Sequence, residues 1–82
     1  MFTTYILFSS STRRFYTGHC EDITIRLAQH NNGRNKSTKG GKLWTIVYTI
    51  ESNTRSEAVG WEEKIKSRGA KRFLNELNII VG

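Results

Sequence analysis

Two tyrosines, an arginine and a histidine are spaced so that one surface of the folded chain could carry all four side chains. Tyr5 and Tyr16 lie in short runs rich in β-branched and aromatic residues, which are typical of strands, and the polar segment between them predicts a hairpin. Arg26 and His30 follow one helical turn apart, so a helix would place them on one face. A guanidinium can neutralise a phosphate, and a phenol or an imidazole can orient or move a proton. The set therefore predicts chemistry on phosphodiesters.

Each of these residues also has an ordinary structural explanation, which the sequence leaves open. A tyrosine in a strand commonly packs its ring and leaves its hydroxyl at the rim. Arg26 could lie on a solvated helix face. His30 could hydrogen-bond a phosphate or a tyrosine hydroxyl, or it could be a residue near a helix end, where a cation suits the helix dipole. The coincidence of four useful side chains favours the functional interpretation.

The first half of the chain must supply a hairpin and a helix to position these residues. Residues 2–8 predict a strand at or near the centre of a sheet, and residues 14–19 predict its hairpin partner. Gly18 is expected to let the backbone turn sharply before the helix. Asp22 is a good N-cap for that helix, and residues 31–33, Asn-Asn-Gly, are expected to end it.

The second half predicts one more strand and two helices. Residues 43–50 form the clearest strand, apolar on both faces and expected to be well covered. Thr54 begins a capping box for a helix that runs to about Lys66. A short break at residues 67–69 precedes a last helix at about residues 70–78.

The apolar end at residues 79–81 is expected to pack back on the body. The order is strand, strand, helix, strand, helix, helix. It predicts a single α/β domain over residues 1–82, with a small three-stranded, mainly antiparallel sheet flanked by helices.

Several short motifs occur in an order that resembles the GIY-YIG nuclease family. They are Thr4-Tyr5-Ile6, Tyr16-Thr17-Gly18, Arg26 and His30, residues 30–39, and Arg55-Ser56-Glu57-Ala58. The chain is most similar to the small single-domain members, which are described as endonuclease-like or excinuclease-like proteins. The first motif is degenerate, since this chain has Thr4-Tyr5-Ile6 in place of Gly-Ile-Tyr, with Tyr5 at the tyrosine position. In the second motif, Tyr16-Thr17-Gly18, threonine replaces isoleucine. The resemblance implies the same fold and a metal-dependent endonuclease that hydrolyses DNA phosphodiester bonds, in DNA repair or recombination.

The resemblance also implies roles for individual residues. Tyr16 would be the phenol that activates or orients water, and Arg26 would stabilise charge on the transferring phosphoryl group. Tyr5 would position a phosphate oxygen or the water. Glu57 would hold a single Mg²⁺ or Mn²⁺, and because one carboxylate makes a weak site, the metal is expected to bind poorly without substrate.

Glu57 has a second interpretation that requires no metal. It stands three residues after Thr54, so its side chain could be the reciprocal partner of that cap. Both interpretations can hold if the carboxylate is partly exposed.

Residues 34–42 are basic, contain glycine and hydroxyl side chains, and include no apolar residue. Such a segment is either a solvated loop or a loop that grips nucleic-acid phosphates. In the second case Lys36 and Lys39 would attract a phosphate, and Ser37 and Thr38 would hydrogen-bond to it.

Other chemically capable residues have simpler explanations. Trp44 and Trp61 could stack on bases, but we expect Trp61 in the core and Trp44 along an edge of the third strand. The basic residues between Lys64 and Arg72 are mixed with nearby glutamates, which favours a solvated face. His19-Cys20 offers only two ligands and therefore predicts no metal site. Some members of the family carry a lysine directly after the glycine, where this chain has His19.

The composition favours a polyanionic partner such as DNA. The 82 residues carry a formal net charge of +6. The single cysteine excludes an intramolecular disulfide and fits a reduced, cytoplasmic setting. We expect no signal peptide, no membrane span and a monomer. The alternative to a nuclease is a nucleic-acid-binding module of the same fold with little or no catalysis, and a third interpretation is a structural or protein-interaction domain.

Overall fold

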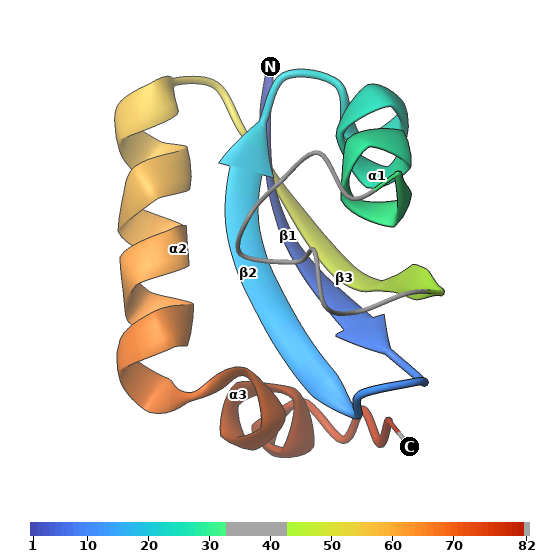
Figure 1. Ribbon diagram of the computed structural model, residues 1–82. Coiled ribbons are helices and arrows are strands. Elements are labelled where there is room, and N and C mark those ends of the chain that lie inside the picture. The colour runs from blue at the N-terminus through green and yellow to red at the C-terminus, as the bar shows by residue number, and fades with distance from the viewer. Residues whose placement is uncertain (33–42, 82) are drawn as a thin grey trace.

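The computed structural model of the chain describes residues 1–32 and 43–81. It contains three strands and three helices in the predicted order (Figure 1). They are β1 (Phe2–Ser9), β2 (Arg14–Cys20), α1 (Ile23–Asn31), β3 (Trp44–Ser52), α2 (Arg55–Arg68) and α3 (Ala70–Glu76). Each helix of the described residues is too short or too polar to cross a bilayer.

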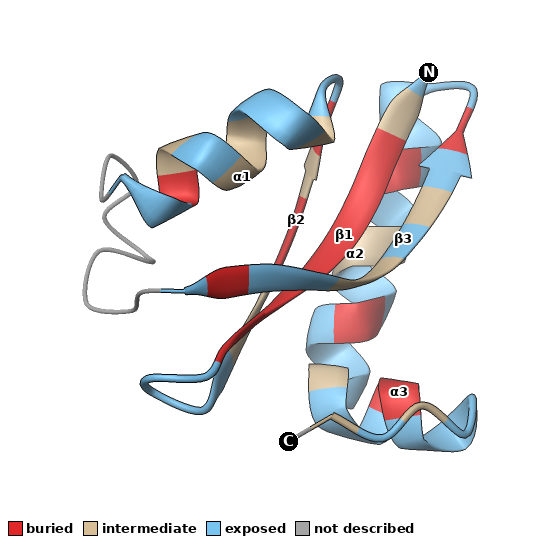
Figure 2. Cartoon of the chain, turned by 90° about the vertical axis from the view of Figure 1, so that its right-hand side faces the viewer, coloured by how far each residue is buried: buried red, intermediate tan, exposed pale blue. Residues whose placement is uncertain are grey.

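The strands form one antiparallel sheet with β1 in the centre. The strand order is β2-β1-β3, and the register places Tyr5 opposite Gly18 on one side and Thr49 on the other. An irregularity between Ile6 and Leu7 shifts the β1–β3 register. From Thr3 to Ser9 every residue of β1 is buried, which confirms the predicted central strand (Figure 2).

The sheet separates two hydrophobic clusters. Alternate residues of a strand point to opposite faces. On the α1 face the buried residues are Tyr5, Leu7, Cys20 and Trp44, with Tyr16, Ile23 and Leu27 packed against them. On the other face, under α2 and α3, the buried residues are Ile6, Ile65, Phe73 and Leu74. The molecule therefore has three layers, with α1 on one side of the sheet and α2 and α3 on the other (Figure 2).

Local contacts set the positions of the helices. The side chain of Asp22 caps α1 by accepting a hydrogen bond from the Ile25 amide at 3.1 Å. At the other end of α1, the Asn31 side chain forms two hydrogen bonds to the first residue of β3. Its oxygen accepts from the Trp44 amide at 2.7 Å, and its amide group donates to the Trp44 carbonyl at 3.2 Å. Gly69, with φ of 92°, separates α2 from α3 at the predicted break.

Four expectations, about the third strand, the two tryptophans and the last helix, need correction. β3 is not well covered, because it is an edge strand of the described sheet and Ile46 is 40% exposed. Trp44 is buried in the cluster on the α1 face, whereas the half-buried Trp61 belongs to neither cluster. The last helix ends at Glu76, although Ile79 and Val81 do pack against the body as predicted.

Candidate active site

Gly18 faces Tyr5 across the β1–β2 ladder, and this contact leaves no room for a side chain. A Cβ at position 18 would lie 2.7 Å from Tyr5 Oη, 3.0 Å from Tyr5 Cζ and 3.2 Å from Tyr16 Cε1. The prediction that Gly18 turns the backbone is wrong, since Gly18 lies inside β2. Its absent side chain instead admits the phenol of Tyr5.

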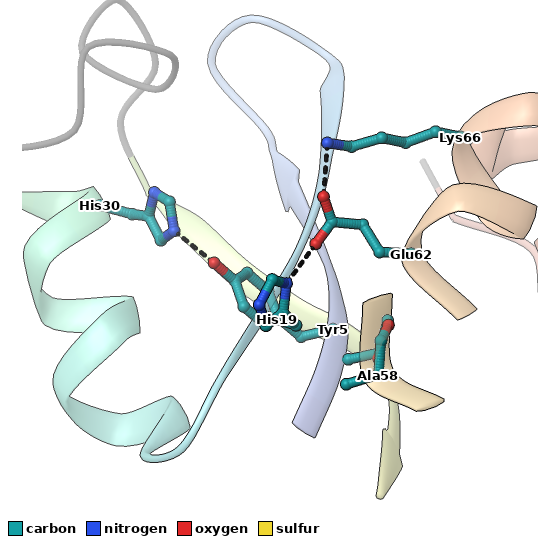
Figure 3. Close-up of polar contacts among 7 residues, drawn as sticks. Tyr5, His19, His30, Ala58, Glu62 and Lys66 are labelled. Atoms are coloured by element: carbon teal, nitrogen blue, oxygen red, sulfur yellow. Dashed lines mark hydrogen bonds and ion pairs between the residues drawn. The ribbon is translucent and has the colours of Figure 1, made fainter. Parts of the chain in front are cut away.

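Three aromatic side chains from three elements meet beside Gly18. The Tyr5 hydroxyl is 2.9 Å from His30 Nε2, and a dashed line in Figure 3 marks this contact. The Tyr16 ring centroid lies 4.8 Å from that of His30 and 6.2 Å from that of Tyr5. The structure therefore brings Tyr5, Tyr16 and His30 together as the sequence predicts.

Arg26 joins this group from the same helix as His30. The positive charge of its guanidinium acts on the Tyr5 hydroxyl. Arg26 and Tyr16 are both partly exposed, whereas Tyr5 and His30 are completely buried. The partly exposed pair is accessible to a substrate, and the buried pair supports it from beneath.

The buried pair consists of neutral groups. Burial, with a smaller contribution from the neighbouring Tyr16, raises the pKa of Tyr5 far above its ordinary value, and Arg26 only partly opposes this. Burial also lowers the pKa of the His30 imidazole, and the positive charge of Arg26 adds to that effect. The expected direct contact of Tyr5 with phosphate or water needs correction, because Tyr5 is 0% exposed in this structure.

Glu57 is not part of this group. It lies exposed in the first turn of α2, on the other side of the sheet from α1 (Figures 1 and 2). Its amide donates to Thr54 Oγ1 at 3.2 Å, and the Thr54 hydroxyl donates to Glu57 Oε1 at 3.1 Å. The cap interpretation of Glu57 is confirmed, and its predicted convergence with the tyrosines needs correction.

A second glutamate, Glu62, which the sequence analysis did not single out, contacts β2, the strand that carries Tyr16-Thr17-Gly18. Glu62 Oε1 lies 2.7 Å from Nδ1 of His19, the residue directly after Gly18, and Glu62 Oε2 accepts from Lys66 Nζ at 2.7 Å (Figure 3). Burial opposes ionisation of Glu62, but the hydrogen bonds and charges of Lys66 and His19 outweigh it and lower its pKa. A signal was present, because Glu62 stands one turn from both Ala58 and Ile65, the residues that α2 buries against the sheet.

The remaining predicted residues and the metal can be placed only in part. Lys36, Ser37, Thr38 and Lys39 lie outside the described residues. Within the described residues, no three His, Cys, Asp or Glu side chains form a group that could hold a metal ion. A site there would depend on one carboxylate and on water.

This combination of a three-layer α/β fold and a Tyr-Tyr-Arg-His group defines a nuclease-like domain, and comparisons with known proteins identify its family. The profile of the GIY-YIG catalytic domain matches residues 1–78. The chain belongs to the GIY-YIG family.

Similar proteins carry the name UPF0213. The chain is 42% identical over 60 residues to a UPF0213 protein of Staphylococcus saprophyticus, covering 72% of this chain and 73% of that protein. It is 38% identical over 63 residues to one from Halobacterium salinarum, covering 73% and 82%. With a relative from Staphylococcus epidermidis, the match is 40% identical and spans 63% of this chain and 65% of that protein.

A solved structure shows the same fold. The solution NMR structure of a UPF0213 protein from Bacillus halodurans matches with a TM-score of 0.57 and 26% identity, over 95% of this chain and 84% of that one. This likeness confirms the predicted fold class.

Proposed function

We propose that this domain is a metal-dependent endonuclease that hydrolyses DNA phosphodiester bonds. The observation that supports this is the convergence of Tyr16, Arg26 and His30 around Tyr5, with Glu62 bound to the strand residue that follows Gly18. Family membership supports a nuclease-type function independently. The net charge of +6 suits a polyanionic substrate.

In this proposal the two partly exposed residues act on the substrate. The Tyr16 phenol orients and deprotonates the attacking water while its ring rests against His30. Arg26 stabilises the charge that develops on the phosphoryl group. Tyr5 and His30 remain neutral beside the positive charge of Arg26.

Glu62 fits a single hard cation better than Glu57 does. Both glutamates lie on α2, across the sheet from α1, but Glu62 contacts His19 of β2, whereas Glu57 completes a helix cap. Lys66 is 56% exposed, so its ammonium could move away and free one Glu62 oxygen. Bound Mg²⁺ or Mn²⁺ would supply Lewis-acid activation and charge neutralisation. A single carboxylate predicts weak binding in the absence of DNA.

Plasmid nicking with Mg²⁺ or Mn²⁺ tests the proposal. Glu62→Gln and Glu57→Gln form a matched pair of variants on α2. Glu62→Gln and Tyr16→Phe should each lower the nicking rate at least about 100-fold, since each removes a group that acts at the reacting centre. Glu57→Gln makes the same chemical change at the cap and should leave the rate within about twofold. If Glu62→Gln cleaves as fast as Glu57→Gln, the assignment of Glu62 is wrong. If the wild-type protein does not nick the plasmid, the proposed reaction is wrong.

One observation favours the alternative of a binding module with little catalysis. Both Glu62 oxygens already have positively charged or titratable partners, Lys66 and His19, so the carboxylate is not open to a cation in this arrangement. A module of that kind would bind DNA with a log affinity that falls linearly with log salt. It would cleave nothing with either metal.

A further inference from the structure

The flank of α2 carries a second surface that the candidate active site does not use. A hollow of about 270 Å³ is lined by Glu57, Gly60, Trp61 and Lys64. A neighbouring hollow of about 320 Å³ is lined by Lys64, Ser67, Arg68 and Arg72. Lys64 lines both hollows, so together they form one track. We call it the α2 track, defined by Gly60, Trp61, Lys64, Ser67 and Arg72.

The α2 track and the candidate site lie on different flanks of the same helix. Successive residues of an α-helix are rotated by about 100°, so Lys64 projects about 160° away from both Glu62 and Lys66, and Ser67 projects about 140° away from Glu62 and about 100° away from Lys66. Glu62 and Lys66 are the residues that face β2 through His19. A ligand in the track would therefore bind at a separate place.

Trp61 gives the track an aromatic face. The side chain is half-buried and outside both hydrophobic clusters, which corrects its expected place in the core. Lys64 Nζ lies 5.0 Å from the centroid of the Trp61 ring. A Cβ built on Gly60 would meet nothing within 4 Å, so the space beside the ring is open. An accessible aromatic ring beside a cation is suited to stack a nucleic-acid base.

The cations of the track are well placed for phosphate because the nearby carboxylates have other partners. Glu76 pairs with Arg68, and Glu62 pairs with Lys66 and His19. Among the described residues, no carboxylate forms an ion pair with Lys64 or Arg72, although the charge of Arg72 acts on Glu76, and Glu76 lines a further hollow together with Lys64.

Two acidic residues remain near this part of α2. Glu57 lies at the far end of the first hollow and is bound to Thr54, and Glu63 is exposed on α2 and lines neither hollow. The Ser67 hydroxyl adds a neutral donor between the cations.

We propose that the α2 track binds single-stranded nucleic acid, with a base stacked on Trp61 and the adjacent phosphate held by Lys64, Ser67 and Arg72. Stacking requires a base face that a duplex hides, which is why a single strand fits better than a double helix. The inference rests on the proposed function for the choice of nucleic acid, but it assigns a surface distinct from the cleavage site.

The test is the binding of a fluorescein-labelled single-stranded oligonucleotide, followed by anisotropy in EDTA over a range of salt. The double variant Lys64→Ala/Arg72→Ala should bind at least about tenfold more weakly. Its salt slope should fall by about 1.4, because each phosphate that a cation neutralises on a single strand accounts for about 0.7. Lys71→Ala is the matched control, since it removes a cation from α3 that lines another hollow, and it should stay within about twofold.

Trp61→Leu tests the stacking interaction separately. It should weaken binding by about fivefold to 100-fold and abolish the quenching of tryptophan fluorescence by the oligonucleotide. Binding to a duplex of the same sequence should change much less. Circular dichroism checks that each variant folds. If Lys64→Ala/Arg72→Ala does not fold, the double variant Lys64→Gln/Arg72→Gln is used in its place.

The outcomes for the α2 track can be told apart from those for the proposed reaction. If the double variant binds as tightly and with the same salt slope as Lys71→Ala, the α2 track is not the site. If Trp61→Leu weakens duplex binding as much as single-strand binding, base stacking is wrong. A wild-type protein that binds through the track but nicks no plasmid would contradict the hydrolase proposal alone.

Discussion

The Tyr5 hydroxyl has two polar neighbours, His30 and Arg26. It lies 2.9 Å from His30 Nε2, and the positive charge of Arg26 acts on it. If the hydroxyl donates to Nε2, the neutral His30 carries its proton on Nδ1. These interactions link the core to the partly exposed Arg26, which explains why a fully buried tyrosine belongs to the candidate site.

Replacing each tyrosine by phenylalanine should separate positioning from direct action. Tyr5→Phe removes the buried hydroxyl that lies 2.9 Å from His30 Nε2 and should lower the free energy of unfolding by about 1–3 kcal/mol. Tyr16→Phe removes a partly exposed hydroxyl and should change stability by less than about 0.5 kcal/mol, while nicking is abolished. Urea denaturation measures both. Equal losses of stability in the two variants would contradict this division of roles.

Gly18→Ala should destabilise the protein because its new Cβ would overlap the Tyr5 phenol, with Oη only 2.7 Å away. Overpacking of this kind costs about 1–3 kcal/mol. Tyr5→Phe removes the clashing oxygen, so the double variant Gly18→Ala/Tyr5→Phe should lose less stability than the two single variants added together. Additive losses would show that the phenol is not what excludes a side chain at position 18.

His30 should make stability depend on pH. Its pKa in the folded state lies below the ordinary value of 6.5, so the unfolded chain takes up the proton more readily. The stabilisation is complete above that ordinary value and is lost as pH falls towards the lowered folded-state pKa. Urea denaturation between about pH 7.5 and pH 5.5 should show this loss in the wild type and in His19→Gln. His30→Gln should show a flatter profile, and an unchanged slope would contradict the assignment.

At the scale of single elements, the capping box of α2 should stabilise the fold without serving catalysis. Thr54→Ala removes the hydroxyl that accepts from the Glu57 amide and should cost about 1 kcal/mol. Ser56→Ala also removes a hydroxyl, at an exposed residue two positions further along the chain, and should be nearly neutral. Thermal unfolding measures both changes. A loss of nicking in Thr54→Ala at a temperature where it is folded would show that the cap also shapes the site.

The elements could be predicted from the sequence because local signals agree with the tertiary structure. Asp22 and Thr54 mark two helix starts by side-chain caps that the structure contains. The apolar run of β1 indicates a strand buried on both faces. The pairing of β1 with both neighbours then follows from the hairpin and from the covering helices.

The errors concern information that a linear pattern does not contain. Glycine favours turns, so the sequence predicts a turn at Gly18, and the pairing of Gly18 with Tyr5 becomes apparent only once the strand register is known. Glu57 stands in the motif-like segment, but the register of α2 on the sheet brings Glu62 to His19 instead. Trp61 has the helical spacing of a core residue, yet it lies at the edge of the buried face.

At the scale of the whole molecule, β1 connects the two hydrophobic clusters. Tyr5 and Leu7 belong to the cluster under α1, while Ile6 belongs to the one under α2 and α3. Neither cluster is large, and the free energy of unfolding of an 82-residue chain is expected to be small. Because the same strand supplies both, the two clusters should form and melt together.

A conservative change in one cluster should therefore shift the unfolding of the other. Ile65→Val removes a methylene from the cluster that does not contain the site and should cost about 0.5–1.5 kcal/mol. In a Trp61→Phe background, Trp44 is the sole tryptophan and reports on the cluster under α1. Its fluorescence and the far-ultraviolet circular dichroism should shift to lower urea together and by the same amount. Ile80→Val makes the same chemical change at a side chain that is 89% exposed and should shift neither signal. If the Trp44 transition stays in place while the helical signal moves, the clusters are independent, and the buried Tyr5–His30 pair does not depend on the packing of α2 and α3.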